Sequence, residues 1–331
     1  MRLLLIVNSS ASSVTARARV VIQKALAADH ELSVAETSRR GHATPLAQGA
    51  AADGLDAVVV LGGDGTINEA ANGLAGTPTA LGVLPGGSTN VFARTIGMTN
   101  DPIEATGELL AALAAGAVRS VDLGRVNGRY FLFHAGFGFD AAVVGEVEKR
   151  SVAKRWFGAA VFVTAAMSTW ARGYDRSSPA FAVRSAEGTV VDDGRFAVCL
   201  KTDPYTFLGS RPLHLAPEAG LDTLLTVVTF RSLRLPTLLL LLAGALRAGK
   251  PATGRSVRPM AHRRTVAVLE DVGAAEILAY RPLPYQVDGD YLGEAERFEL
   301  RSVPGALRLV VPLSVSADRD VHAGRRGRGP R

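Results

Sequence analysis

The sequence contains the stretch Leu61-Gly62-Gly63-Asp64-Gly65-Thr66-Ile67-Asn68-Glu69, which lies between an apolar strand-like run at Ala57–Val60 and a helix-like run that reaches Leu74. A strand, a glycine turn and a helix start are the parts of an anion site. Glycine lets the backbone approach a ligand closely, and a helix N-terminus presents free N–H groups to a phosphate. Asp64 adds a carboxylate where the metal ion of a nucleotide would lie. The stretch therefore predicts a loop that binds the phosphates of a nucleotide.

The first ~120 residues alternate strand and helix signals, as a parallel sheet requires. We expect strands at 3–7, 32–36, 57–61 and 80–84, and helices at 16–28, 45–52, 67–74, 91–95 and 103–115. In the first of these helices, the periodicity places Val20, Val21 and Ala25 on the apolar face. Ligands bind such sheets at the carboxyl ends of the strands, so the loops at that edge are the candidates for a site.

Two further loops leave predicted strands at this edge. The first strand is followed by Asn8-Ser9-Ser10-Ala11-Ser12, and the fourth by Pro85-Gly86-Gly87-Ser88-Thr89-Asn90. Their small polar side chains are suited to hydrogen bonds with phosphate oxygens. Each loop also has an ordinary interpretation, a solvated turn for the first and a helix cap for the second.

The pattern changes near Val121. Extended runs at 121–126 and 130–134 are joined by Asn127-Gly128, the strongest short signal of a β-hairpin. After a helical segment at about 152–169, further strands are expected at 181–184, 196–201, 224–230, 265–269, 276–279, 297–301 and 306–312. Because turn-like segments join most of these strands, the second half predicts an antiparallel sandwich or barrel, of which we favour the β-sandwich. The expected fold class is α/β plus all-β.

Composition places the chain among globular enzymes and excludes a disordered chain. Its 331 residues are enough for two domains with separate cores, and 47% of them are hydrophobic against 21% charged. The single cysteine, Cys199, excludes an internal disulfide framework, and its apolar neighbours predict a core residue. Part of the net charge of +6 lies in a basic segment at 325–331, which we expect to be solvated.

One segment, Leu233–Leu246, is intensely apolar and is flanked by Arg234 and Arg247. It is shorter than the ~20 residues that span a bilayer. We interpret it as a buried amphipathic or core helix. The alternative is a lip that enters the membrane interface or guards a lipid entrance.

Two acidic segments occur in the second half. Asp288-Gly289-Asp290 follows the extended run Tyr285-Gln286-Val287 and places two carboxylates on a turn. Gly136-Phe137-Gly138-Phe139-Asp140 ends the hairpin region with a carboxylate before a helix. By themselves, the first is compatible with an ordinary hairpin turn and the second with a helix cap by Asp140.

Taken together, these stretches resemble the diacylglycerol kinase catalytic-domain family, which includes bacterial lipid kinases, sphingosine kinases and ceramide kinases. The resemblance is carried by Asn8, Thr37, the glycine stretch at 62–69, the run at 85–94 and Asp288-Gly289-Asp290. It covers the chain from Leu3 to about Pro312 and is densest between Glu36 and Gly97. The joint pattern is specific, although no single motif is.

The resemblance implies a nucleotide domain akin to that of phosphofructokinases and NAD kinases at 1–120, completed by about 300–315, a β-rich lipid-substrate domain at 121–299, and a site between them. Residues 316–331 are expected to be a disordered basic tail. ATP and its Mg²⁺ are then expected at Asn8, Ser9, Ser10, Ala11, Ser12, Thr37, Gly63, Asp64, Gly65, Thr66, Ile67, Asn68, Glu69 and Ser88.

The resemblance also implies roles for acidic residues. Asp64 and Asp222 are expected as metal ligands, and Asp140 and Asn90 near the lipid substrate. Asp288 or Asp290 matches the acidic residue credited with deprotonating the lipid hydroxyl, a role that sphingosine kinases give to the residue matching Asp64. We favour the late turn, because Asp64 is better placed for the metal.

The chain departs from the family pattern at three positions. Val91 follows Asn90 where bacterial diacylglycerol kinases often have aspartate, and Asp290 replaces the usual glutamate. Thr223 follows Asp222 where the family's Asp-Asp-Gly metal segment has glycine. These departures bear on the structural magnesium site and on the choice of base.

The leading hypothesis is an ATP-dependent lipid kinase that phosphorylates a hydroxyl of diacylglycerol or a related lipid. The alternatives are a catalytically silent nucleotide- or lipid-binding homologue and an NAD kinase-like enzyme, which shares the Gly-Gly-Asp-Gly loop. We expect a cytoplasmic protein, peripherally associated with the inner face of the cell membrane through its lipid substrate and without a nucleic-acid partner. An exposed sheet edge would also allow a homodimer.

Overall fold

The computed structural model describes residues 1–149, 159–172, 174, 178–247 and 265–315. The chain divides into two compact units, one of residues 1–121 with the chain from 305 onward, and one of residues 122–304. The predicted tail at 316–331 and the first part of the predicted helix at 152–169 lie outside the described residues.

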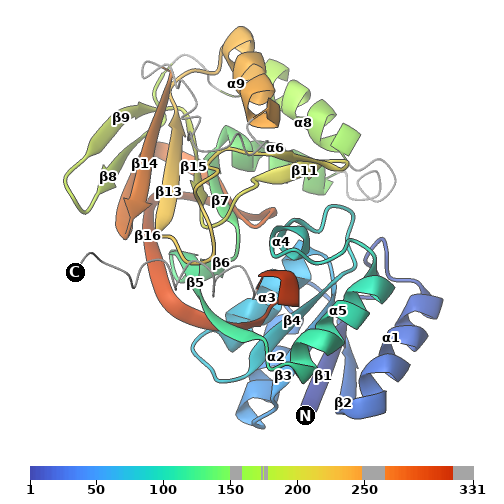
Figure 1. The fold of residues 1–331 in the computed structure, drawn as a ribbon. Coiled ribbons are helices and arrows are strands. Elements are labelled where there is room, and N and C mark those ends of the chain that lie inside the picture. Colours follow the sequence, from blue (N-terminus) through green and yellow to red (C-terminus); the bar gives the residue numbers. More distant parts are fainter. Residues whose placement is uncertain (150–158, 173, 175–177, 248–264, 316–331) are drawn as a thin grey trace, which may run out of the picture. The chain divides into compact units, whose positions relative to one another are not determined.

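Unit 1 is built on a parallel sheet (Figure 1). Its strands follow the order β2 (Glu31–Glu36), β1 (Arg2–Val7), β3 (Ala57–Gly62) and β4 (Ala80–Pro85), and the end of β16 (Asp290–Val310) pairs with β4. All residues of β3 and β4 are buried, which explains their unbroken apolar sequence. The predicted order of strands and helices in this half is confirmed.

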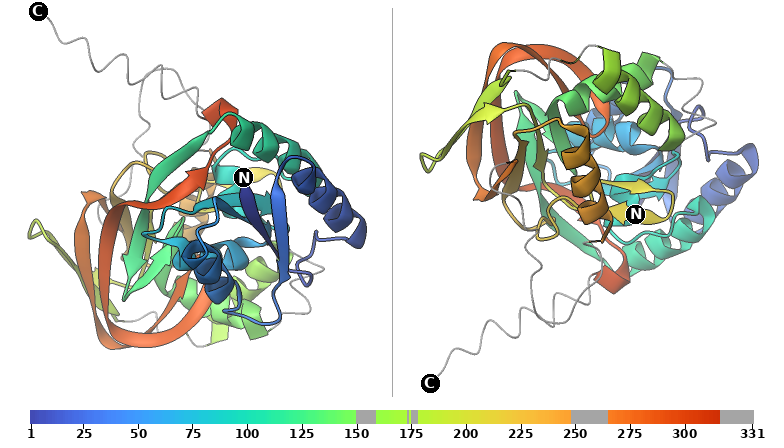
Figure 2. Two further views of the ribbon diagram at one scale, coloured as in Figure 1. Left: turned by 90° about the horizontal axis from the view of Figure 1, so that it is seen from below. Right: turned by 90° about the horizontal axis from the view of Figure 1, so that it is seen from above.

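Helices cover both faces of this sheet (Figures 1 and 2). One face carries α1 (Ala16–Asp29) and α5 (Pro102–Ala114), the other α2 (Ala43–Ala52) and α3 (Asp64–Leu74), and the short α4 (Val91–Thr95) follows β4. The predicted apolar face of α1 is wrong. The helix buries Ala18, Ile22 and Leu26, which share one face because they are four residues apart. Val20 and Val21 are instead 50% and 39% exposed.

Unit 2 is built on an antiparallel sheet. Its strands follow the order β14 (Val266–Val272), β13 (Leu225–Phe230), β10 (Phe196–Leu200), β7 (His134–Gly138), β15 (Ala274–Val287) and β16. Around it lie β5 (Val118–Val126), β6 (Arg129–Phe131), β8 (Phe181–Ser185), β9 (Val190–Gly194), the hairpin of β11 (Thr206–Leu208) and β12 (Arg211–Leu213), and helices α6 (Phe139–Lys149), α8 (Ala159–Arg172) and α9 (Leu235–Arg247).

The predicted hairpin at Asn127-Gly128 is confirmed. It joins β5 to β6, and the two residues have φ angles of 46° and 89°, as the tight turn of a two-residue hairpin requires. The predicted separate strands at 297–301 and 306–312 are wrong, because β16 runs without a break from Asp290 to Val310. Strands β9, β11 and β12 are short and were not predicted.

Strand β10 separates the two hydrophobic cores of unit 2. Phe196, Val198 and Leu200 face one core, which α6, α8 and α9 help to form, whereas Ala197 and Cys199 face the other, between strands. This alternation follows from the two-residue period of a β-strand. Cys199 is buried, as predicted.

The interpretation of Leu233–Leu246 as a buried helix is wrong for most of its length. The segment forms α9, but Ala245 is its one buried residue. None of the helices in the described part of the chain has the length and hydrophobicity that crossing a membrane requires.

We predict that Gly73→Ala lowers the free energy of unfolding by about 1–3 kcal/mol through overpacking. A Cβ at Gly73 in α3 would lie 2.6 Å from the carbonyl oxygen of Thr44 and 2.9 Å from the Cβ of Ala47 in α2. Gly107→Ala in α5 is the matched control, because a Cβ there meets no atom within 4 Å. It should raise the free energy of unfolding by roughly 0.5–1 kcal/mol. Urea titration measures both changes, and a stabilised Gly73→Ala variant would contradict the packing.

Candidate functional site

The two glycine loops of unit 1 lie directly against each other. The N–H of Gly86 donates to the carbonyl of Gly62 at 2.8 Å. A Cβ on Gly87 would lie 2.8 Å from the Cα of Gly63, so the contact requires glycine. Gly63 is the N-cap of α3, and the helix therefore begins at Asp64 and not at Ile67 as predicted. The predicted phosphate loop is in fact a single turn residue followed by the first turn of a helix.

Asp64 connects the first loop to the second. Its carboxylate accepts hydrogen bonds from the N–H groups of Val91 at 3.0 Å and Phe92 at 2.9 Å, and thereby caps the N-terminus of α4. On the same helix, burial lowers the pKa of Arg94, while the charge of Asp64 acts in the opposite direction. Asp64 therefore has a structural partner in addition to its predicted metal role.

The loop after β1 joins the same edge of the sheet. Asn8 donates through Nδ2 to the hydroxyl of Thr66 at 2.9 Å and accepts from the N–H of Ser10 at 3.1 Å. Ser13, just beyond the predicted stretch, donates to the carbonyl of Gly87 at 3.1 Å. The N–H of Thr37 bonds to the carbonyl of Val7 at 2.9 Å. The structure thus brings together the loops at 8–13, 62–66 and 85–90.

Within these loops, the predicted residues differ in exposure. Ser9, Ser10, Ser12 and Ser88 are exposed, and Asn8, Ala11, Thr37, Gly63, Asp64 and Gly65 are half-buried. Ser9 is engaged by Glu36, whose carboxylate accepts its hydroxyl at 2.6 Å. The edge therefore offers exposed hydroxyl groups beside glycine backbone.

Three further predicted residues have buried, mainly structural contacts. Ile67 belongs to the core, and Asn68 bonds to Asn72 one turn further along α3. Glu69 accepts the N–H groups of Gly41 at 2.6 Å and Ala43 at 3.0 Å, and so holds the start of α2.

Asn90 has the left-handed conformation, with a φ of 50°. Its side chain accepts from the N–H of Gly87 at 2.7 Å and donates to the oxygen of Asn100 at 2.8 Å. Those contacts shape the second loop.

Unit 2 contains a buried polar cluster around Asp140, in the first turn of α6. The carboxylate accepts hydrogen bonds from the hydroxyl of Tyr205 and from Nε2 of Gln286 at 2.8 Å. Burial raises the pKa of Asp140, although both hydrogen bonds oppose that shift. Burial also raises the pKa of Tyr205, and the adjacent carboxylate adds to the effect. A Cβ on Gly136 would overlap the carboxylate, so β7 needs glycine there.

Asp288 lies on the turn between β15 and β16, with a φ of 48°. Its buried carboxylate accepts three backbone N–H groups, from Leu132 at 2.7 Å, Phe133 at 3.0 Å and His134 at 3.0 Å. Asp290, two residues later, is half-buried. The two predicted bases therefore have different environments.

Sequence analysis missed three members of this cluster: His134, Tyr205 and Gln286. The sequence carried a signal for Gln286, because it is an amide residue inside a predicted extended run. The structure buries Gln286 fully, and a buried amide requires a polar partner. His134 lies at a ring-centre distance of 4.5 Å from Tyr205. Burial lowers the pKa of His134 to about 3, and its Nδ1 has no hydrogen-bond partner.

Near Asp222, the structure places a buried lysine that the sequence did not suggest. Nζ of Lys201 donates to the carbonyls of Thr223 and, at 3.4 Å, Gly220, and lies 3.8 Å from the carboxylate of Asp122. Burial lowers the pKa of Lys201, while Asp122 and Asp222 oppose that shift. In the described residues, no three His, Cys, Asp or Glu side chains are grouped to hold a metal. Lys201 thus places a positive charge beside Asp122 and Asp222, in the segment where the resemblance implied a structural magnesium ion.

Comparison with known proteins shows which family and fold this chain resembles. Residues 2–126 match the sequence model of the diacylglycerol kinase catalytic domain. The family resemblance is confirmed for this region. A diacylglycerol kinase of Bacillus subtilis is 43% identical over 121 residues, or 36% of this chain and 39% of the relative. One of Staphylococcus aureus is 38% identical over 107 residues, or 32% and 33%. The matched region thus spans less than two fifths of these curated relatives.

Solved structures extend the likeness of fold to the whole chain. A crystal structure of a diacylglycerol kinase from Bacillus anthracis has a TM-score of 0.68 and 20% identity, and covers 95% of this chain and 98% of that one. An NAD kinase from Archaeoglobus fulgidus in complex with ATP has a TM-score of 0.50 and 12% identity, and covers 99% and 100%. At these identities the likeness concerns the fold, and it confirms the predicted fold class.

We predict that His134 makes the fold acid-sensitive. Its pKa of about 3 in the folded state lies below the ordinary 6.5, so the unfolded chain binds a proton that the folded chain excludes. Its contribution to stability is therefore complete above pH 6.5 and is lost as the pH falls toward 3.

The loss of unfolding free energy amounts to at most about 1.4 kcal/mol for each pH unit. His134→Gln should remove it, because glutamine does not bind the proton. Asp140 titrates in both proteins and cancels in the comparison. Urea unfolding of both proteins between pH 7 and pH 4 measures the difference, and parallel pH profiles would contradict the assignment.

Proposed function

We propose that the protein is an ATP-dependent lipid kinase that transfers the γ-phosphate to a hydroxyl of diacylglycerol or a related lipid. One observation carries the proposal. The backbones of two glycine loops touch at the carboxyl edge of the parallel sheet, at the N-terminus of α3, within the region that matches the diacylglycerol kinase catalytic domain. Such an edge suits phosphates, because backbone N–H groups and a helix dipole stabilise negative charge there.

Phosphoryl transfer requires positioning and charge neutralisation more than covalent chemistry by the protein. In the proposed site, the loops at 8–13, 62–66 and 85–90 hold the nucleotide, with the exposed hydroxyls of Ser10, Ser12 and Ser88 available to it. Asp64 keeps the second loop against the first through Val91 and Phe92.

The acidic residues of this edge are compatible with Mg²⁺ that arrives with the nucleotide. Mg²⁺ usually binds through one or two carboxylates together with substrate phosphates and water, and Asp64 is a half-buried carboxylate beside the loops. When bound, the ion would neutralise phosphate charge. Near Asp222, the ammonium group of Lys201 supplies a positive charge. We therefore do not assign a second Mg²⁺ ion to Asp222.

The acceptor lipid is assigned to unit 2, where the buried Asp140 cluster offers hydrogen-bonding groups to a head group. Gln286 connects this cluster to the late turn, since it donates to Asp140 and accepts the N–H of Gly289 at 2.8 Å. The carboxylate of Asp288 already binds three N–H groups. We therefore assign the proton acceptor to Asp290, and to Asp288 the positioning of the chain at 132–134.

The test of the activity is γ-phosphate transfer from radiolabelled Mg-ATP to a panel of diacylglycerols, sphingoid bases and glycolipids. We expect phosphorylation of at least one lipid class. Gly87→Ala should lower ATP affinity by about tenfold or more, because the new Cβ separates the two loops. Gly49→Ala in α2 is the matched control, since a Cβ there meets no atom within 4 Å. A protein that binds ATP and phosphorylates no lipid would favour a silent homologue.

We predict that Asp290→Asn lowers turnover by about 10²–10⁴-fold, the usual contribution of a general base, with ATP binding unchanged. Asp288→Asn should instead lower the free energy of unfolding by about 1–3 kcal/mol, because three buried N–H groups lose a charged acceptor. Calorimetric ATP titration, turnover and urea unfolding of both variants separate the two effects. Turnover near the wild-type rate in both would assign the base to Asp64.

A further inference from the structure

Helix α9 presents a stripe of leucine side chains to solvent. Leu235, Leu239, Leu242 and Leu246 follow one another at intervals of four, three and four residues, so at 3.6 residues per turn they share one face. They are 44%, 56%, 41% and 36% exposed, and Leu240 beside them is 70% exposed. A surface helix of a soluble protein normally carries polar side chains on this face. An exposed apolar group of this kind indicates an interaction surface.

The face of α9 next to this stripe is anchored to unit 2. Leu238 and Leu241 pack against the hydrophobic core that α6, α8 and β10 form, and Ala245 is buried. Just before the helix, the carbonyl of Leu233 accepts the indole N–H of Trp170 from α8 at 2.8 Å. These contacts hold the leucine stripe outward, so its exposure is a property of the packed helix.

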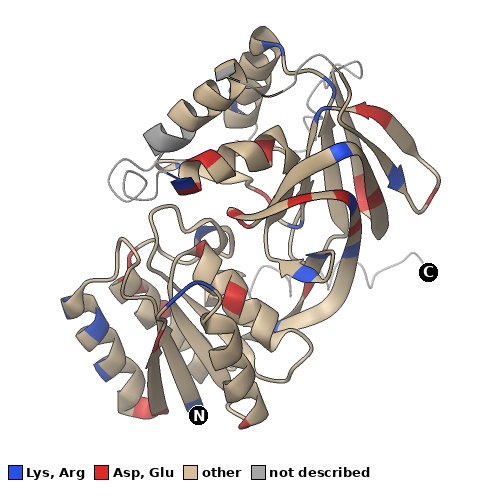
Figure 3. Ribbon diagram, turned by 180° about the vertical axis from the view of Figure 1, so that it is seen from behind, with Lys and Arg blue, Asp and Glu red and all other residues tan. Residues whose placement is uncertain are grey.

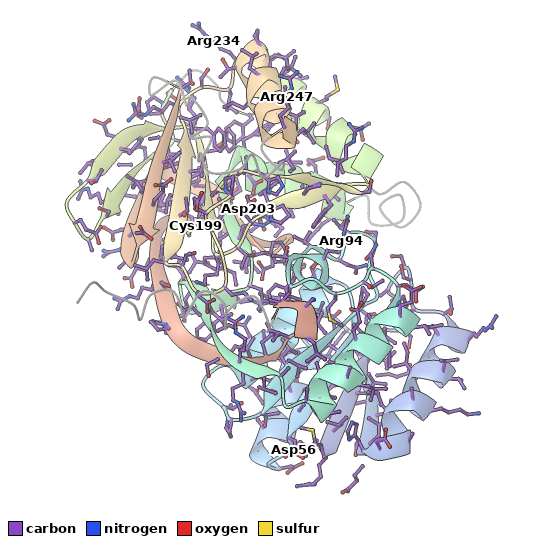
Figure 4. The ribbon with its side chains drawn as sticks, in the orientation of Figure 1. Asp56, Arg94, Cys199, Asp203, Arg234 and Arg247 are labelled. Carbon is purple, nitrogen blue, oxygen red and sulfur yellow. The ribbon has the colours of Figure 1, made fainter. Side chains whose placement is uncertain are left out.

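Charge indicates which partner fits this stripe. The segment 232–247 contains Arg234 and Arg247 and no acidic residue, and both arginines are exposed (Figure 4). Figure 3 shows α9 largely without charged residues, in contrast to the strands of unit 2. Leucine side chains between two exposed arginines are typical of a helix that lies in the interface of an anionic membrane.

We propose that α9 docks the protein onto an anionic phospholipid bilayer, with Leu235, Leu239, Leu240, Leu242 and Leu246 inserted into the interface and Arg234 and Arg247 among the lipid head groups. The proposed lipid kinase activity provides the reason for docking, but the docking itself rests on the exposure and charge of α9. Docking of this kind would bring unit 2 to the surface in which an apolar acceptor resides.

The experiment measures binding without ATP or acceptor lipid. Full-length protein is floated with vesicles of phosphatidylglycerol and phosphatidylcholine, and with vesicles of phosphatidylcholine alone. We expect binding to the anionic vesicles, and a fall in partition coefficient of about tenfold or more for Leu239→Glu/Leu240→Glu. Val20→Glu/Val21→Glu, which places the same charges on exposed positions of α1, should bind like the wild type. Equal thermal midpoints show that both variants fold.

A fluorescent label tests insertion directly. Cys199 is the one cysteine of the chain, is buried, and has a raised thiol pKa because of that burial, so a new exposed cysteine is labelled selectively. An environment-sensitive dye on Leu239→Cys should shift to the blue when anionic vesicles are added, whereas the dye on Val20→Cys should not shift.

Three results would overturn the proposal. The first is wild-type binding by Leu239→Glu/Leu240→Glu, and the second is an unshifted dye at position 239 in the presence of bound vesicles. The third is a wild-type dimer in light scattering that the same substitutions dissociate, without vesicle binding, which would assign the stripe to a second copy of the chain.

Turnover on a short-chain, water-soluble diacylglycerol is measured in parallel. Loss of docking with retained turnover refutes the docking alone, and docking without turnover on any acceptor refutes the proposed function alone.

Discussion

The backbones of two loops in unit 1 touch because neither carries side chains at the point of contact. Gly62 and Gly86 are joined by a hydrogen bond of 2.8 Å, and Gly87 leaves no room for a Cβ against Gly63. Asp64 then closes the arrangement by capping α4 from a distant part of the chain. The start of α3, the position of α4 and the hydroxyls around them all depend on this approach, and so does any nucleotide site at this edge.

In unit 2, the main constraint is that buried polar groups need hydrogen-bond partners. The carboxylate of Asp288 satisfies three backbone N–H groups at residues 132–134, which connect β6 to the start of β7. Gln286 satisfies Asp140 on one side and the late turn on the other. Since an unpaired buried donor costs about 1–3 kcal/mol, these contacts fix the turn that presents Asp290. A catalytic arrangement at this turn would thus be supported by residues that do no chemistry themselves.

Unit 2 also buries a charged side chain, the ammonium group of Lys201. Lys201 is fully buried, and its ammonium group is held by two carbonyls and nearby carboxylates. Desolvation of a charge is offset when hydrogen bonds and opposite charges surround it. Lys201 is held in this way by the carbonyls of Gly220 and Thr223 and by the carboxylate of Asp122.

Much of the fold followed from local pattern. Continuous apolar runs predicted β3 and β4, Asn127-Gly128 predicted the hairpin of β5 and β6, and the glycine stretches predicted the edge at which the loops meet. These features depend on residues close in sequence, so a single chain is enough to recognise them. The exposure of α9 was not predictable in this way, because a leucine-rich helix has the same sequence whether its leucines face a core or the solvent.

By itself, then, the sequence determined the strand and helix order of unit 1, the glycine loops and the family to which residues 2–126 are similar. Tertiary structure decided what each carboxylate touches: Asp64 the start of α4, Asp140 a tyrosine and an amide, and Asp288 three N–H groups. It also decided that Lys201 lies beside Asp122 and that the leucines of α9 face outward. The physical reason is that hydrogen bonding and exposure depend on contacts between residues far apart in the chain, such as Leu132 and Asp288, which are 156 positions apart, and no local pattern encodes such contacts.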